Sequence, residues 1–184
     1  METKENHKPF LLRLIDTLSE VIGYLSGIAI FLSALVIVHQ VVARYFLGIP
    51  TVWQTEFSIY LLMFASFAGA AYGLKHRAHV GVDIIVEKLS PRTQSLLRII
   101  TSFFCLALIL LVTWKAWGMW WEATKLGWKS SSLWGTPLTY PYFILPLGMS
   151  LLSLQYIVFI YEEFKNFNNN KERETSIEGS STSL

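Results

Sequence analysis

The sequence predicts an all-α membrane protein with four transmembrane helices and a short amphipathic helix on the cytoplasmic side, between the second and third of them. Three observations lead to this fold class. Only 15% of the 184 residues are charged and 53% are hydrophobic, whereas soluble domains carry about 25% charged residues. The apolar residues are concentrated in four long runs, and most lysines and arginines lie on one side of them. Too few charges remain to coat a water-soluble surface, which excludes a soluble enzyme and an intrinsically disordered chain.

Net charge and motif content exclude further classes. A formal net charge of +2 is too small for the broad basic face of a nucleic-acid-binding protein. The single cysteine, Cys105, excludes an intramolecular disulfide and a cysteine-based zinc cluster. Gly-x-Ser-x-Gly, His-Glu-x-x-His and phosphate-binding glycine loops do not occur in the sequence. We therefore expect no enzymatic activity, no catalytic residues, no metal ligands and no bound cofactor.

Each of the four apolar runs is long enough to cross a bilayer once its flanks are counted, since a transmembrane helix needs about 20 mostly apolar residues. The runs lack the polar alternation of a strand, and a helix satisfies its backbone polar groups within the segment. The uncharged cores of the runs are 21–38, 57–74, 99–114 and 142–160. The expected spans are about 18–42, 54–75, 92–121 and 140–161.

Small residues recur every four positions in the first two spans. Gly23 and Gly27 lie in the first span, and Ala65, Gly69 and Gly73 lie in the second. Such faces allow helices to approach closely in lipid, where packing drives association. The alternative is that glycine and alanine are simply common in membrane helices. We expect the face around Gly69 to be a helix-packing face.

The segment between the second and third spans carries a helical pattern of its own. Its apolar residues recur at i, i+3, i+4 and i+7 (Val82, Ile85, Val86 and Leu89). Asp83 and Glu87 fall on the opposite face, so we expect a short amphipathic helix on the membrane surface or against a partner. Ser90 is a good N-cap and Pro91 a good first helical residue, so this pair should begin the third span.

Tryptophans and prolines mark the third and fourth spans. Trp114, Trp117 and Trp121 repeat at helical spacing, which extends the third span to about residue 121. Tryptophan favours the membrane–water interface, so an interfacial anchor explains these residues better than a ligand cage does. Pro141 and Pro146 either kink the fourth span or mark its start.

The distribution of lysine and arginine predicts the orientation. Eleven lie before the first span, between the second and third spans, or after the fourth, and four lie in the other two connections. By the positive-inside rule both termini are cytoplasmic. We divide the chain into a cytoplasmic N-terminal segment (1–17), a four-helix membrane domain (18–161) and a cytoplasmic tail (162–184). The tail is rich in Asn, Ser, Glu and Lys, and we expect it to be disordered.

The centres of the spans contain no Asp, Glu, Lys or Arg. Transporters usually place ionisable or discontinuous-helix sites near the midplane, so this pattern is typical of an accessory or scaffold subunit. At the first outer connection, Arg44 and Glu56 either form an ion pair or are a snorkelling arginine and a solvated glutamate. A haem-binding anchor would need two histidines at one depth, and His39 and His79 are expected on opposite sides.

Residues 41–89 read VVARYFLGIPTVWQTEFSIYLLMFASFAGAAYGLKHRAHVGVDIIVEKL. They resemble the small membrane subunit of tripartite ATP-independent periplasmic (TRAP) transporters, the DctQ-type family. The matching elements are Arg44-Tyr45 with Gly48, Trp53 with Glu56, Gly69-Ala70-Ala71, and His79 with Val82-Asp83. Pro50 departs from the family, which more often has a polar residue near this connection. Outside this stretch the resemblance rests on four spans and cytoplasmic termini.

The resemblance implies a complex in a bacterial inner membrane. A large TRAP permease subunit would hold the substrate and sodium sites, and a periplasmic substrate-binding protein would deliver an organic acid. Uptake would be driven by an ion gradient, usually sodium, and the small subunit would brace the large one, here as a separate polypeptide. The positions that carry over as structural or subunit-interface candidates are Arg44, Tyr45, Trp53, Glu56, Gly69, His79 and Asp83. The alternative function is a small four-helix membrane anchor of a redox or enzyme complex.

Overall fold

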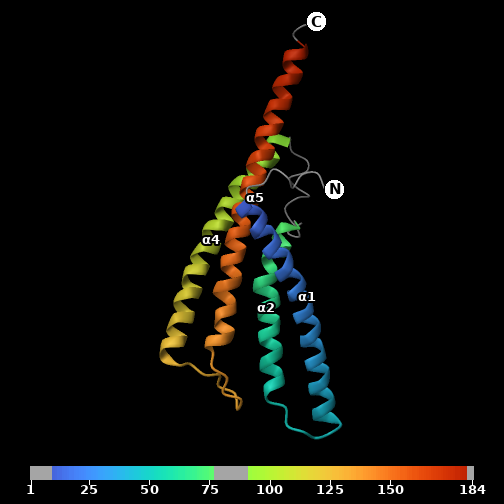
Figure 1. Cartoon of the computed structure of the whole chain (residues 1–184), viewed down its shortest axis with the longest axis vertical. Coiled ribbons are helices and arrows are strands. Elements are labelled where there is room, and N and C mark those ends of the chain that lie inside the picture. The colour runs from blue at the N-terminus through green and yellow to red at the C-terminus, as the bar shows by residue number, and fades with distance from the viewer. Residues whose placement is uncertain (1–9, 77–90, 182–184) are drawn as a thin grey trace.

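The computed structural model describes residues 10–76 and 91–181. Four long helices dominate it (Figure 1), and in the described part of the chain there is no strand beyond one isolated bridge. They are α1 (Phe10–Tyr45), α2 (Trp53–Lys75), α4 (Pro91–Leu126) and α5 (Thr139–Ser181). All four are long and apolar enough to cross a membrane, which confirms the predicted all-α membrane fold. The amphipathic helix expected at 82–89 lies outside the described residues.

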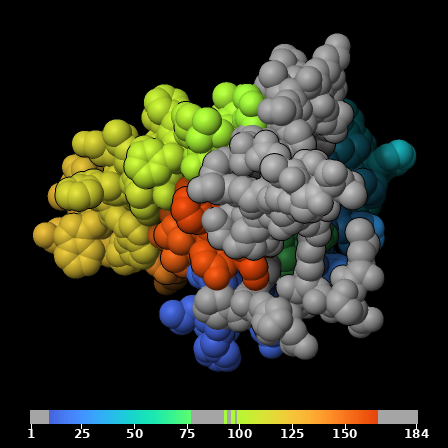
Figure 2. Space-filling view, turned by 90° about the horizontal axis from the view of Figure 1, so that it is seen from above, coloured from blue at the N-terminus to red at the C-terminus, as the bar shows by residue number. Residues whose placement is uncertain are grey.

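The helices form an open row rather than a closed bundle. α1 and α2 pack together as one hairpin, α4 and α5 as a second, and the hairpins meet where α2 packs on α5. The lateral order is therefore α1, α2, α5, α4 (Figure 1), with a smaller contact between α1 and α5. Seen along the helices, α4 lies on one side, α1 and α2 lie on the other, and α5 lies between them (Figure 2).

The row has two distinct ends. The connections 46–52 and 127–138 lie at one end, which we call the loop end. The opposite end, which we call the termini end, holds the start of α1, the end of α2 and the start of α4 (Figure 1). α5 continues past it.

Glycines in a left-handed conformation end two of the helices at the loop end. Gly48 has φ +63° and Gly127 has φ +62°. After α1 the backbone N–H of Ile49 donates to the carbonyl of Ala43 at 3.0 Å, which caps carbonyls that the helix leaves unsatisfied. Any other residue in this conformation would be strained. The two hairpin turns are thus encoded locally by glycine.

The helix ends differ from the expected spans. α1 begins at Phe10 rather than near 18, α4 continues to Leu126 rather than 121, and α5 continues to Ser181. The last difference concerns the segment 162–184, which was expected to be disordered. Glu, Lys and Arg in this segment are good helix formers, and extending a helix that already exists avoids the cost of nucleation. α4 begins at Pro91, as the Ser90–Pro91 pair predicted.

Candidate functional site

The two hairpins meet through a close approach of their backbones. A Cβ atom on Gly148 of α5 would lie 2.6 Å from the carbonyl carbon of Phe67, 2.7 Å from its oxygen, and 2.9 Å from the nitrogen of Ala68. Ala68 and Ala71, next to this contact on α2, have no exposed surface. Small residues permit this distance between helices in lipid. Sequence reasoning missed Gly148 because no second small residue follows it four positions later.

The packing face expected around Gly69 is present between α1 and α2. A Cβ on Gly69 would lie 3.0 Å from the Ser26 hydroxyl oxygen, and a Cβ on Gly23 would lie 2.3 Å from the ring of Tyr72. Gly27 has nothing within 4 Å, so it does not belong to this contact. The small-residue interpretation is therefore confirmed for Gly69 and Gly23, and Gly27 makes no close contact within the described part of the chain.

On α1 the packing seam is made mainly by serines, with Gly23 among them. Three buried serines, Ser19, Ser26 and Ser33, recur every seven residues. A seven-residue spacing keeps side chains on one face of a helix. Their hydroxyls are satisfied: Ser26 donates to the carbonyl of Ile22 at 2.8 Å, and Ser33 donates to that of Ser58 at 3.3 Å. The heptad spacing is a sequence signal that could have identified this face.

Near the termini end a buried hydrogen-bond chain joins α1 to α5. The Ser19 hydroxyl donates to Gln155 Oε1 at 2.8 Å, and Gln155 Nε2 donates to Asp16 Oδ1 at 3.0 Å. All three residues are at most 4% exposed. Buried polar side chains with partners of this kind specify one arrangement of helices. We call Asp16, Ser19 and Gln155 the buried clasp.

Beside the buried clasp, α2 ends in an ion pair with α1. Lys75 Nζ lies 2.7 Å from Glu20 Oε2 and donates to the backbone carbonyl of Asp16 at 3.0 Å. His76 Nε2 lies 3.2 Å from the same Glu20 oxygen. The Lys75 and Glu20 side chains are 23% and 29% exposed, so the pair contributes about 1 kcal/mol at most. Sequence reasoning used Lys75 only to orient the chain.

At the loop end, Glu56 joins the two hairpins. Its carboxylate accepts a hydrogen bond from the Tyr60 hydroxyl at 3.2 Å and another from the hydroxyl of Ser130 in the connection between α4 and α5. An antiparallel bridge between Lys129 and Pro137 shapes that connection. We call the contact of Glu56 with Ser130 the loop clasp. It fixes the 127–138 connection over the start of α2.

The ion pair considered for Glu56 does not form. Within the described residues Glu56 has hydroxyl partners, and Arg44 makes no ion pair with it. Arg44 and Tyr45 are exposed at the end of α1, and Tyr45 has 79% of its surface accessible. Of the two alternatives for Arg44, a solvated or snorkelling side chain agrees with the structure. A hydroxyl-bonded Glu56 was not among the expectations, because Ser130 lies 74 residues away in the sequence.

Trp53 lies in an aromatic cluster at the loop end. Its ring centroid is 6.5 Å from that of His39 on α1, 6.1 Å from Phe57 and 6.5 Å from Trp134 of the 127–138 connection. Aromatic rings at such separations attract one another beyond their area burial. Trp53 is therefore a structural residue that joins three segments. The remaining candidates, His79 and Asp83, lie outside the described residues.

The helix row offers no evident metal or haem site in its described part. Within residues 10–76 and 91–181, no three His, Cys, Asp or Glu side chains are grouped so that they could hold a metal ion. His39 lies toward the loop end of α1, whereas His76 follows α2 at the termini end. The polar side chains gathered at each end bind one helix to another.

The family of the chain follows from comparison with known proteins. A family model described as "Tripartite ATP-independent periplasmic transporters, DctQ component" matches residues 33–166. The C4-dicarboxylate TRAP transporter small permease protein DctQ of Vibrio cholerae is 25% identical over 156 aligned positions, which cover 71% of this chain and 66% of the relative. The ectoine TRAP transporter small permease protein TeaB of Halomonas elongata is 25% identical over 150 positions, with 81% and 77% covered.

A third relative matches over a shorter stretch. A putative TRAP transporter small permease protein of Haemophilus influenzae is 30% identical over 86 positions, which cover 47% of this chain and 53% of the relative. The matched part of the chain thus spans between about half and three quarters of each relative. Because the family model covers most of the helix row, including the Gly148 contact, the loop clasp and Gln155, the chain belongs to the DctQ family of TRAP transporter small permease subunits.

Proposed function

We propose that this chain braces the large permease subunit of a TRAP transporter that takes up an organic acid, driven by an ion gradient and most simply by sodium. A periplasmic substrate-binding protein delivers the acid to the complex. Family membership supports the assignment to transport, and the names of two relatives refer to C4-dicarboxylates and to ectoine. The bracing role rests on the chain's own side chains.

The observation that carries the proposal is where the charged residues lie. Each of the four helices contains an uncharged stretch of 16 residues or more, at 21–38, 57–74, 99–114 and 142–160. The ion pair, the buried clasp and the loop clasp lie outside or at the edges of these stretches. A charge inside a membrane is costly and normally marks a substrate or ion pathway. A chain that has its ionic contacts at the ends of its helices is suited to holding shape.

The open row also supports a bracing role. Much of its apolar surface is uncovered: on α1 alone, Phe31 is 65% exposed and Val38 is 59% exposed. Exposed apolar surface of this extent marks a contact with lipid or with another protein. A row of helices has two broad sides, so one side can pack on the large subunit while the other faces the bilayer.

We propose the following arrangement in the membrane. The bilayer of a bacterial inner membrane is crossed by 18–42, 54–75, 92–121 and 140–161, with both termini, including 1–17 and 162–184, in the cytoplasm. Arg44, Tyr45, His79 and Asp83 are candidates for contacts with the large subunit. Trp53, Glu56 and Gly69 act within the chain, through the contacts described above.

Reconstitution tests the proposal. Vesicles that contain this chain alone are expected to take up no organic acid. Vesicles that contain it with the large permease, supplied with the binding protein, should show uptake that depends on an inward sodium gradient and is lost when potassium replaces sodium. Uptake by the chain alone would refute the bracing role, and sodium-independent uptake by the complex would refute the assigned coupling ion.

A further inference from the structure

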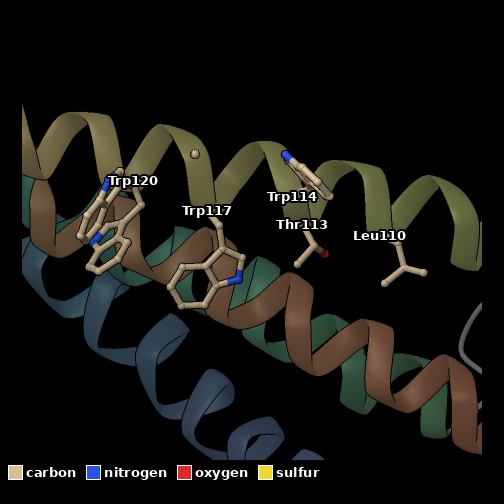
Figure 3. Close-up of a pocket in the computed structure, with 7 residues that line it drawn as sticks. Leu110, Thr113, Trp114, Trp117 and Trp120 are labelled. Carbon is tan, nitrogen blue, oxygen red and sulfur yellow. The ribbon is translucent and has the colours of Figure 1, made fainter.

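α4 carries an open groove on its half nearest the loop end (Figure 3). The groove has a volume of about 630 Å³ and runs from Leu110 to Trp121. Pockets that bind small ligands have volumes of about 300–1,000 Å³. Its lining is almost wholly apolar and aromatic, with Thr113 as its hydroxyl-bearing residue. Its inner wall is held against α5, and its outer side, with Trp114 and Trp121, is exposed.

The groove results from one glycine between two tryptophans. Trp114, Gly118 and Trp121 are spaced i, i+4 and i+7, which places them on one face of α4. A Cβ on Gly118 would meet nothing within 4 Å. The flanking Trp114 and Trp121 side chains are 79% and 55% exposed. Gly118 therefore forms the floor of the groove, and the two exposed indoles lie on either side of it.

The wall facing α5 is fixed in place. Trp117 and Trp120 extend toward α5 (Figure 3), where Trp117 Nε1 donates to Ser150 Oγ at 3.2 Å and Trp120 Nε1 donates to the Thr139 carbonyl at 3.1 Å. By contrast, the indole N–H groups of Trp114 and Trp121 donate no hydrogen bond within the described part of the chain. The groove is thus a preformed apolar channel with two donors left for a ligand.

The length of the groove and the positive charge at one end of it identify the occupant. The eleven residue steps from Leu110 to Trp121 cover about 16 Å of helix at 1.5 Å per residue, which is close to half of a hydrocarbon core of about 30 Å. Lys125 lies one turn beyond Trp121, with its ammonium 5.1 Å from the centre of that ring. An ammonium at one end of an apolar channel as long as one leaflet complements a phosphate at the head of an acyl chain.

We propose that this groove binds one phospholipid from the leaflet at the loop end. An acyl chain lies over Gly118 between the two exposed indoles, and the phosphate lies beside Lys125. The indole N–H of Trp121, beside Lys125, donates to an ester or phosphate oxygen, as tryptophans at membrane interfaces do. The lipid fills a notch that a flat helix surface lacks, so it exchanges more slowly than the lipids around it.

Native mass spectrometry of the full-length chain in mild detergent, titrated with dioleoyl-phosphatidylglycerol, tests the proposal. The unaltered chain should retain one lipid at low concentration. Gly118→Leu fills the groove and should abolish this retained lipid. The matched control is Gly27→Leu, since Gly27 is also open on a helix surface, and it should retain the lipid. Equal retention by the unaltered chain and Gly118→Leu, or equal loss in both variants, would overturn the proposal.

A second variant keeps the test independent of the folding of Gly118→Leu. Lys125→Gln alters an exposed side chain and should weaken retention about fivefold, the effect of one lysine near an anionic lipid surface. Unchanged lipid retention in Lys125→Gln would refute the placement of the phosphate beside Lys125. Photo-crosslinking from a benzophenone maleimide attached to Gly118→Cys, with Cys105→Ser, in membranes that hold the assembled transporter, tests for a protein occupant. A crosslink to a second polypeptide would overturn the proposal.

Discussion

Gly148→Ala should separate the two hairpins, because this glycine lies where α5 meets α2. The added methyl would lie 2.6–2.9 Å from three backbone atoms of Phe67 and Ala68. Carbon atoms prefer separations of about 3.5–4.0 Å, so the helices must move apart by about 1 Å. Backbone atoms cannot rotate away as a side chain does. The displacement therefore spreads along the contact between α2 and α5.

The size of the effect follows from two opposing terms. In an open helix position, Gly→Ala stabilises by up to about 1 kcal/mol through helix propensity. Inserting a methyl into a well-packed contact destabilises by about 1–3 kcal/mol. Gly148→Ala should thus lose about 2–4 kcal/mol relative to a glycine replaced at an open position, the sum of these two terms. Gly27→Ala is that control, because a Cβ there meets nothing within 4 Å.

Reversible unfolding of the full-length chain in mixed micelles, titrated with sodium dodecyl sulfate and followed by circular dichroism, measures the difference. Gly27→Ala should match or exceed the unaltered chain in free energy of unfolding, and Gly148→Ala should fall below it. Equal values for the two alanine variants would refute the close approach at Gly148. A similar loss of unfolding free energy in both variants would also refute it, because it would reflect a general intolerance of added side chains in these helices.

The other predictions use the same titration. Gly23→Ala should cost about 1–3 kcal/mol, the usual range for overpacking, because the new methyl would lie 2.3–2.7 Å from Cδ2, Cγ and Cβ of Tyr72, at the base of that side chain. Gln155→Leu removes two buried hydrogen bonds, to Ser19 and to Asp16, and should cost about 1–3 kcal/mol. Gln40→Leu breaks an exposed bond to Thr55 and should cost far less. Equal losses of unfolding free energy in the two variants would refute the stabilising role of the buried clasp. Glu56→Gln should lower the unfolding midpoint, because it weakens the hydrogen bonds from Tyr60 and Ser130. Arg44→Gln should leave the midpoint unchanged. If adding Arg44→Glu restored the midpoint lost in Glu56→Arg, the two side chains would form an ion pair, contrary to the structure.

The four helices were predictable because lipid imposes one simple demand. A segment that crosses a bilayer must form hydrogen bonds among its own backbone N–H and C=O groups and carry little charge, and both properties are local. The start of α4 at Pro91 was predictable for the same reason, since a proline at the first helical turn acts on its own neighbours. Local rules of this kind fix where helices lie in the sequence.

The order of the helices was not predictable, because it depends on pairs far apart in the chain. The bond between Gln155 and Asp16 joins residues 139 positions apart, and the loop clasp joins residues 74 positions apart. Gly148 contacts backbone atoms rather than another small side chain, so no repeat in the sequence reveals it. The ion pair considered between Arg44 and Glu56 does not form, because the presence of opposite charges near one connection does not determine which partner a carboxylate binds.

The three contacts between the hairpins have a mechanical consequence. Two plates that touched only along α2 and α5 would swing about that line, like the covers of a book. The Gly148 approach and the contact of Ser130 with Glu56 hold α5 and its connection to α2 at two heights, and contacts along this line do not by themselves oppose the swing. The Asp16–Gln155 bond joins α1 to α5 and therefore lies off the line. Because it ties the outer helix of one hairpin to the inner helix of the other, it resists opening, and a force applied to α1 reaches α5 directly.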